Sequence, residues 1–228
     1  MSVSTNINSE KITNFISKNR KKILVAVAAA LAVAVVVCIT LLVKDHLTKK
    51  AIAALDSVEY SYSTKKMAAK TAENTDVLLA DAQKAALSGV KEYLGKSGAA
   101  GVRANMLAGS VAFDQKDFEN SLKYFIAAVK ADEKAYTAPI AYFNAAECAE
   151  MCGKSDDAVA YFKKAAESKD FYLVSHAWFN AGRVSETNGK FDIAATFYKK
   201  VTDLGLNDDW TKLAHSRLIV LKAENKVN

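Results

Sequence analysis

Apolar residues follow two patterns along the chain, and each pattern predicts a different kind of helix. From residue 23 to residue 43 they form one run without a charged side chain. After residue 44 they recur three or four residues apart, which is the spacing of one face of an α-helix. No segment alternates apolar and polar residues for long enough to predict a β-strand. The expected fold class is therefore all-α.

The uncharged run is long enough to cross a membrane. It has 21 residues, and at 1.5 Å per residue a helix of this length spans roughly 30 Å, the thickness of a bilayer core. The alternatives are a buried helix of a soluble domain, a cleaved signal peptide and lipidation at Cys38. The large residues at the end of the run argue against cleavage. Val37 stands where a lipoprotein signal has a small residue. We expect an uncleaved transmembrane helix at 23–43.

The charge distribution predicts the orientation of this helix. The chain has 228 residues and a net charge of +6, but residues 1–22 hold five bases and one acid. Most of the excess charge therefore belongs to a tail, and it does not indicate nucleic-acid binding. Four of these bases lie within five residues of the run, against one in the five residues after it. We expect a cytoplasmic N-terminus and a C-terminal domain outside, in the periplasm of a bacterium.

Residues 44–100 are expected to form a long helix followed by a degenerate helical hairpin. No Gly or Pro interrupts residues 44–72. The sequence at 74–76 (Asn-Thr-Asp) predicts a turn and a helix cap, and a second apolar face runs from Leu79 to Tyr93. Gly95, Gly98 and Gly101 then mark another turn.

An internal repeat begins near residue 101. Small residues return at intervals of 37 and 36 residues in two separate series, and these share one period. The first series is Gly109, Ala146 and Gly182, and the second is Ser121, Ala158 and Ala194. The period predicts helix–turn–helix units in which small residues let the two helices approach closely. Each unit also has an aromatic residue on its second helix. These aromatics, Phe125, Phe162 and Tyr198, are expected to fill the gap to the next unit.

These units resemble the tetratricopeptide repeat family. The resemblance is carried by aromatic-x-x-small-small openings at Tyr142–Ala146 and Trp178–Gly182, by Gly153 and Gly189 before the second helices, and by the closing Ala-x-x-x-aromatic pattern. The first unit departs from it, since Asn105 replaces the opening aromatic. The resemblance implies a helical-repeat solenoid that binds protein or peptide partners. The anchor and repeats together resemble the ancillary subunit of the bacterial Sec translocon, a likeness of architecture that no motif carries.

The predicted organisation has five parts. Residues 1–22 form a basic cytoplasmic tail and 23–43 the transmembrane helix. Residues 44–100 form the long helix and hairpin. Residues 101–206 form three repeats, and 207–228 a C-terminal capping helix.

The chain carries no motif for catalysis, so we expect no enzyme and no cofactor. His46, His176 and His215 lack metal-ligand spacing. Cys148 and Cys152 share one helix face, but no second pair completes a zinc site, and we expect no metal. We interpret them as small, partly buried residues. A redox pair is the alternative.

The resemblance places a binding groove on the first helix of each repeat. In these positions Phe143 and Phe179 stand where a carboxylate-binding member has a basic residue, so such a clamp is not expected. Exposed Phe and Met side chains there favour apolar partners. Asn144 and Asn180 can bond either a peptide backbone or their own repeats. The expected groove residues are Arg103, Met106, Ser110, Phe113, Ile140, Phe143, Asn144, Glu147, Glu150, His176, Phe179, Asn180, Arg183 and Glu186.

The sequence thus favours a membrane-anchored scaffold or adaptor, chaperone-like in the biogenesis of envelope or secreted proteins. The alternative is an envelope component that self-associates without clients, through a terminal helix carrying Trp210, Leu213, Leu218 and Leu221. No nucleic-acid partner is expected.

Overall fold

The computed structural model describes residues 3–71, 75–169 and 171–228, and every regular element in these ranges is a helix. The predicted all-α fold is therefore confirmed. The chain divides into two compact units, residues 1–50 and 51–228. The elements are α1 (Val3–Ala69), α2 (Thr75–Val90), the short 3₁₀-helix η1 (Lys91–Tyr93), α3 (Gly98–Asp114), α4 (Phe118–Ala131), α5 (Ala138–Met151), α6 (Ser155–Ala166), α7 (Val174–Thr187), α8 (Phe191–Asp203) and α9 (Asp209–Ala223).

Helix α1 contains the apolar run and continues well beyond it. It is unbroken to Ala69, as the absence of Gly and Pro after residue 44 predicts. Among the described residues, α1 is the one helix that is long and apolar enough to cross a membrane. The large side chains of the run are exposed, between 50% and 70% for those from Leu24 to Val43. This exposure is compatible with a single-pass anchor, because lipid would cover such a surface.

The last turns of α1 pair with α2 and form the start of the second unit. Leu55 and Tyr62 are buried in one cluster with Ala82 and Val90 of α2. A Cβ atom added to Gly89 of α2 would lie 2.7 Å from a methyl group of Val58, so the two helices are in close contact. The end of α1 and α2 therefore pack as neighbouring helices. Of the predicted turn, Asn74 lies outside the described residues, and α2 begins at Thr75.

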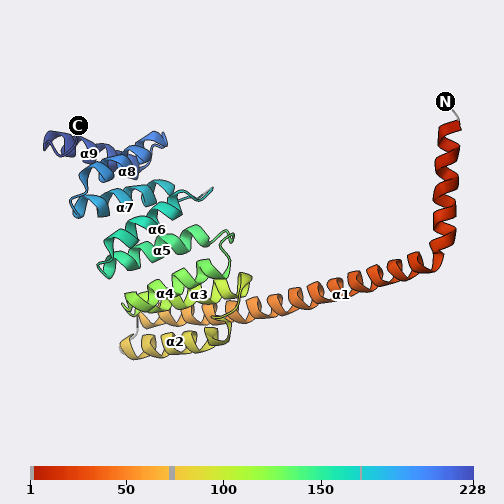
Figure 1. Cartoon of the computed structure of the whole chain (residues 1–228). Helices are drawn as coiled ribbons and strands as arrows, with labels where there is room; N and C mark the ends of the chain where they lie inside the picture. Colours follow the sequence, from red (N-terminus) through yellow and green to blue (C-terminus); the bar gives the residue numbers. More distant parts are fainter. Residues whose placement is uncertain (1–2, 72–74, 170) are drawn as a thin grey trace. The chain divides into compact units, whose positions relative to one another are not determined.

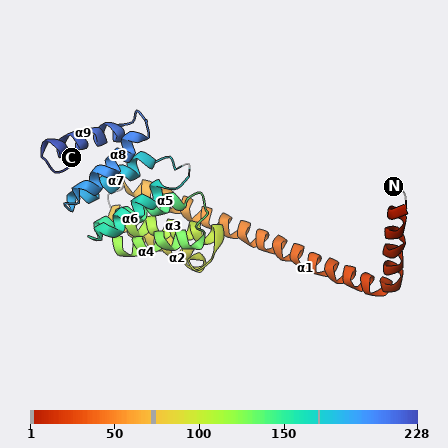
Figure 2. The ribbon, with the colours of Figure 1, turned by 45° about the horizontal axis from the view of Figure 1, so that its top comes forward.

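Three further helix pairs follow, α3–α4, α5–α6 and α7–α8, with α9 after them (Figure 1 and Figure 2). The paired helices are close where the small residues lie. A Cβ atom on Gly109 would come within 2.8 Å of the Phe125 ring, and one on Gly182 within 2.7 Å of the Tyr198 ring. The predicted close approach is confirmed. These two rings thus lie against the first helix of their own pair, and Phe125 also belongs to one buried cluster with Phe143 and Ala146 of the next unit, as expected.

The turn inside each repeat needs one residue with a positive φ. Gly153 and Gly189 have φ of 71° and 70°, and Lys116 takes the same place in the first repeat with a φ of 60°. In this conformation the backbone N–H of Gly153 donates to the carbonyl of Glu150 at 2.9 Å and closes the end of α5. Gly adopts a positive φ without steric cost, so the two glycines of the family resemblance have a backbone cause.

The terminal helix α9 packs on its own chain. Asp208 caps it by accepting from the backbone N–H of Thr211 at 2.8 Å. Leu221 is fully buried, and the ring of Trp210 stacks on His176 at 3.8 Å. The expectation that these side chains form a free pairing face is therefore wrong for Trp210 and Leu221. Leu213 is 45% exposed.

Candidate functional site: a cleft on the first-helix face

Ion pairs join neighbouring first helices along one surface of the repeat unit. We call the surface formed by residues 51–69 of α1 and by α3, α5, α7 and α9 the first-helix face. Arg103 of α3 donates to Glu59 of α1 at 2.9 Å. Arg183 of α7 makes two parallel bonds of 2.7 Å to Glu150 of α5. Such half-exposed pairs stabilise the fold by less than about 1 kcal/mol each, but they fix which side chains border this face.

A cleft of about 780 Å³ opens at the N-terminal end of the first-helix face. It lies between the last turns of α1, α3 and the loop at 132–137. Its volume is within the range of about 300–1,000 Å³ that is usual for ligand sites. Its apolar lining comprises Ile52, Tyr62, Ala99, Val102, Met106, Leu107, Ala135 and Tyr136. Its polar lining comprises Glu59, Ser63, Lys66, Arg103, Ser110, Asp114, Asp132 and Thr137.

Acids outnumber bases in this lining. Both basic side chains are already paired, Lys66 with Asp114 and Arg103 with Glu59. Asp132 accepts the backbone N–H of Lys134 at 3.0 Å and has no ion pair with any described residue. The cleft therefore combines an apolar surface with an excess of negative charge, which favours a ligand that carries a positive charge.

Asp114 ties the end of α3 to α1 at one wall of the cleft. The Tyr62 hydroxyl donates to its carboxylate at 2.7 Å, and the Lys66 ammonium is its ion-pair partner. Burial raises the pKa of Tyr62, and the hydrogen bond to Asp114 raises it further. The phenol therefore stays a neutral donor at physiological pH and holds this wall in place.

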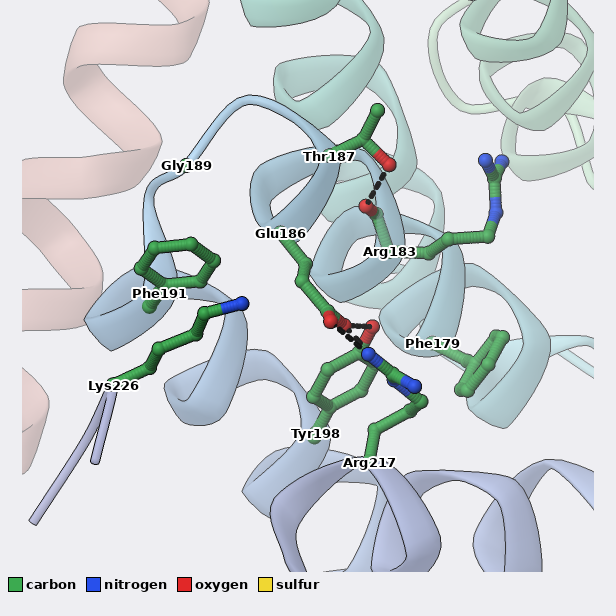
Figure 3. Close-up of a pocket in the computed structure, with 9 residues that line it drawn as sticks. All are labelled: Phe179, Arg183, Glu186, Thr187, Gly189, Phe191, Tyr198, Arg217 and Lys226. Atoms are coloured by element: carbon green, nitrogen blue, oxygen red, sulfur yellow. Dashed lines mark hydrogen bonds and ion pairs between the residues drawn. The ribbon is translucent and has the colours of Figure 1, made fainter. Parts of the chain in front are cut away.

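A smaller pocket of about 440 Å³ lies between α7, α8 and α9 (Figure 3). Glu186 accepts from the Tyr198 hydroxyl at 2.7 Å and from the Arg217 guanidinium. Burial alone would raise the pKa of Glu186, but these hydrogen bonds outweigh it and lower that pKa. Figure 3 shows that the Arg183 guanidinium points away from this carboxylate. Glu186 is thus occupied by donors of its own chain. The pocket is lined by Phe179, Arg183, Glu186, Thr187, Gly189, Phe191, Tyr198, Arg217 and Lys226.

Between the two pockets, aromatic rings fill the space beneath the first-helix face. The ring centroid of Phe143 lies 5.2 Å from that of Phe162 and 4.8 Å from that of His176. His176 in turn stacks on Trp210, and Phe179 packs beside Trp210 at 5.4 Å. Such ring pairs are worth roughly 0.5–1.5 kcal/mol beyond the area that they bury. This part of the face is core.

The predicted groove residues lie in four places: the buried core, the cleft, the smaller pocket and the surface outside both. Phe143, Phe179 and Asn180 are buried, so the expectation that the two phenylalanines are exposed is wrong, although Phe179 still borders the smaller pocket. Asn180 accepts from Nε of Arg183 at 3.2 Å, a bond within its own repeat. The others fall into three groups. Arg103, Met106 and Ser110 line the cleft, Arg183 and Glu186 line the smaller pocket, and Phe113, Ile140, Asn144, Glu147, Glu150 and His176 lie at the surface or half-buried outside both.

The sequence missed most of the cleft. Glu59, Tyr62 and Lys66 belong to the helix before the repeats, which shows no repeat period. Tyr136 carried a usable signal, since it precedes Tyr172, which is also exposed, by 36 residues. Both tyrosines stand in loops between repeats.

The two neighbouring cysteines are unlinked thiols. Cys148 is fully buried beside the hydroxyl of Ser121 at 3.1 Å, and Cys152 is half-buried. Burial raises the pKa of Cys148 to about 11, which removes thiolate character at neutral pH. Among the described residues, no group of three His, Cys, Asp or Glu side chains gathers as metal ligands.

Comparisons with known proteins identify the repeats. Residues 106–172 and 152–205 match a family model described as tetratricopeptide repeat. A "TPR repeat-containing protein" of Treponema pallidum (strain Nichols) is 29% identical over 79 residues, 35% of this chain and 33% of that protein. The chain thus aligns with about a third of the length of this curated relative.

Solved structures are similar to this chain in fold. The apo form of RapI has a TM-score of 0.52 at 12% identity, covering 76% of this chain and 70% of RapI. The crystal structure of MamA has a TM-score of 0.46 at 18% identity, covering 68% of this chain and 91% of MamA. At 12% identity, the likeness to RapI concerns the helical-repeat fold alone.

Proposed function

The repeat domain of this chain belongs to the tetratricopeptide repeat family, and we propose that the chain is a membrane-anchored adaptor that binds a protein segment in the cleft. Repeats of this family are protein-interaction scaffolds. The proposal further assigns a membrane anchor and a location to the chain. The apolar run supports a membrane anchor, and the bases before it favour a cytoplasmic N-terminus, which in a bacterium would place the anchor in the inner membrane. The repeats would then lie in the periplasm and serve envelope or secreted proteins.

The open cleft is the observation that carries this proposal. Elsewhere on the first-helix face, rings such as Phe143 and Phe179 fill the corresponding space. At the cleft, Met106 and Val102 present apolar surface and Tyr136 is 91% exposed beside them. An exposed aromatic beside an apolar hollow is typical of residues that anchor a protein partner. The carboxylate of Asp132, which has no ion pair with a described residue, adds a preference for Lys or Arg next to an apolar side chain.

Photocrosslinking from the cleft tests the proposal. The full chain, with a photoreactive amino acid at Ser110, is irradiated in cell membranes, and the crosslinked segment is identified and synthesised. Its affinity for the full chain is then measured by calorimetry. We expect Met106→Phe or Asp132→Lys to weaken binding at least about tenfold, because each removes apolar space or the attracting charge.

Two matched substitutions away from the cleft serve as controls. Met151→Phe and Asp203→Lys make the same chemical changes at exposed positions, and each should leave the affinity within about twofold. Equal weakening by both sets would contradict the cleft as the site. A crosslink to a second copy would favour the self-associating alternative. A cytoplasmic protein as partner would contradict the periplasmic location.

A further inference from the structure

The segment before the apolar run carries a narrow apolar stripe of its own. At about 100° per residue, the side chains of Ile12, Phe15 and Ile16 fall within an arc of about 100° on α1. They are 59%, 64% and 51% exposed. Among the described residues of this unit, 3–50, no element other than α1 is present to cover this stripe.

Basic side chains border this stripe. The helical spacing places Lys11, Lys18 and Lys22 along one edge and Arg20 along the other. Residues 11–22 contain no acid. An apolar stripe flanked by bases is the arrangement of a helix that lies in a membrane–water interface.

We propose that residues 11–22 form an amphipathic helix that lies on the anionic lipid surface of the membrane crossed by residues 23–43. This inference rests on the proposed anchor. The segment directly precedes the run, and at 1.5 Å per residue its far end is within about 18 Å of the bilayer core. Anionic headgroups complement the bases, and the stripe reaches the boundary with the acyl chains.

The local backbone of α1 suits this placement. The helix changes direction near its N-terminal end (Figure 1 and Figure 2). The Asn19 side-chain amide donates to the carbonyl of Phe15 at 3.0 Å, and a side-chain bond of this kind competes with the helix ladder where helices bend. A change of direction is needed between a segment that follows the surface and a helix that crosses the bilayer.

Hydrogen exchange of the full chain in lipid nanodiscs tests the proposal. Amides of residues 11–22 are compared in discs of zwitterionic lipid and in discs with about a third of anionic phosphatidylglycerol. We expect exchange to be at least about tenfold slower in the anionic discs, because each base near an anionic surface adds to the attraction. Amides of residues 23–43 serve as the internal reference and should be protected in both.

Alanine substitutions separate lipid contact from helix formation. The triple variant Ile12→Ala, Phe15→Ala, Ile16→Ala should lose the protection, although Ala is the better helix former. The matched control Asn14→Ala, Ser17→Ala changes the opposite side of the helix and should keep it. Fast exchange of 11–22 in both lipids, with 23–43 protected, would overturn this inference and leave the anchor intact. Fast exchange of both segments would overturn both proposals.

Discussion

The first-helix face has the same helical-repeat backbone at its two ends. An open cleft lies at the end formed by α1 and α3, whereas packed aromatic side chains fill the end formed by α5, α7 and α9. Met106, Phe143 and Phe179 occupy equivalent positions of the three repeats, at intervals of 37 and 36 residues. Phe143 and Phe179 are buried among other rings, whereas Met106 is half-buried at the wall of a cleft. At this position of the repeat, Phe accompanies a filled core and Met accompanies an open cleft.

The ion pairs make this contrast sharper. Arg103–Glu59 and Arg183–Glu150 each bridge two neighbouring first helices, so the helices are joined in the same way at both ends. The cleft thus lies beside an interhelical ion pair, as the filled part does. Its lining combines Met106, where Phe143 and Phe179 stand in the other repeats, with the loop that carries Tyr136.

The largest expected difference lies in the free energy of unfolding when these equivalent residues are truncated. Phe143→Ala should lower it by about 3–5 kcal/mol, because the substitution leaves a cavity among packed rings. Met106→Ala should lower it by about 1–2 kcal/mol, since one side of Met106 already borders open space. Denaturant unfolding of the full chain in detergent, followed by the fluorescence of Trp178 and Trp210, measures both. Similar losses would mean that the cleft is packed like the core.

A second test concerns the turns inside the repeats. Lys116→Gly should raise the free energy of unfolding by about 1 kcal/mol, because it removes the strain of a left-handed backbone from a residue with a Cβ atom. Gly153→Ala should lower it by a similar amount. Gly95→Ala is the control, since that glycine has no positive φ and no atom within 4 Å of an added Cβ. A loss of stability in Lys116→Gly would show that Lys116 stabilises the turn by another contact.

These elements also show how far sequence reasoning reaches. The repeat period located the contacts of Gly109 and Gly182, and the family resemblance located the turns at Gly153 and Gly189, because small size and positive φ restrict the residue type. Lys116 gave no such signal, since lysine is common at any surface position. The resemblance names the first helix as the groove but does not separate its solvent side from its packed side, and Phe143 lies on the packed side.

The smallest expected effect is a pH dependence of stability that arises from His176, in the aromatic cluster of α5, α7 and α9. His176 lies between the rings of Phe143 and Trp210. Burial lowers its pKa below the usual 6.5, and the nearby charge of Arg183 lowers it further. The unfolded chain therefore binds a proton there more readily than the folded chain, and stability should fall as the pH drops below about 6.5.

The half-buried Glu147 acts in the opposite sense, because burial and the adjacent Glu150 raise its pKa. A comparison with His176→Phe isolates the histidine, since phenylalanine keeps the ring contacts and cannot take up the proton. The difference in unfolding free energy between this variant and the original chain, measured between about pH 5 and pH 7.5, should grow in favour of the variant toward low pH. A difference that is constant with pH would mean that His176 has the same pKa in the folded and in the unfolded chain, so that its surroundings do not disfavour the charged form.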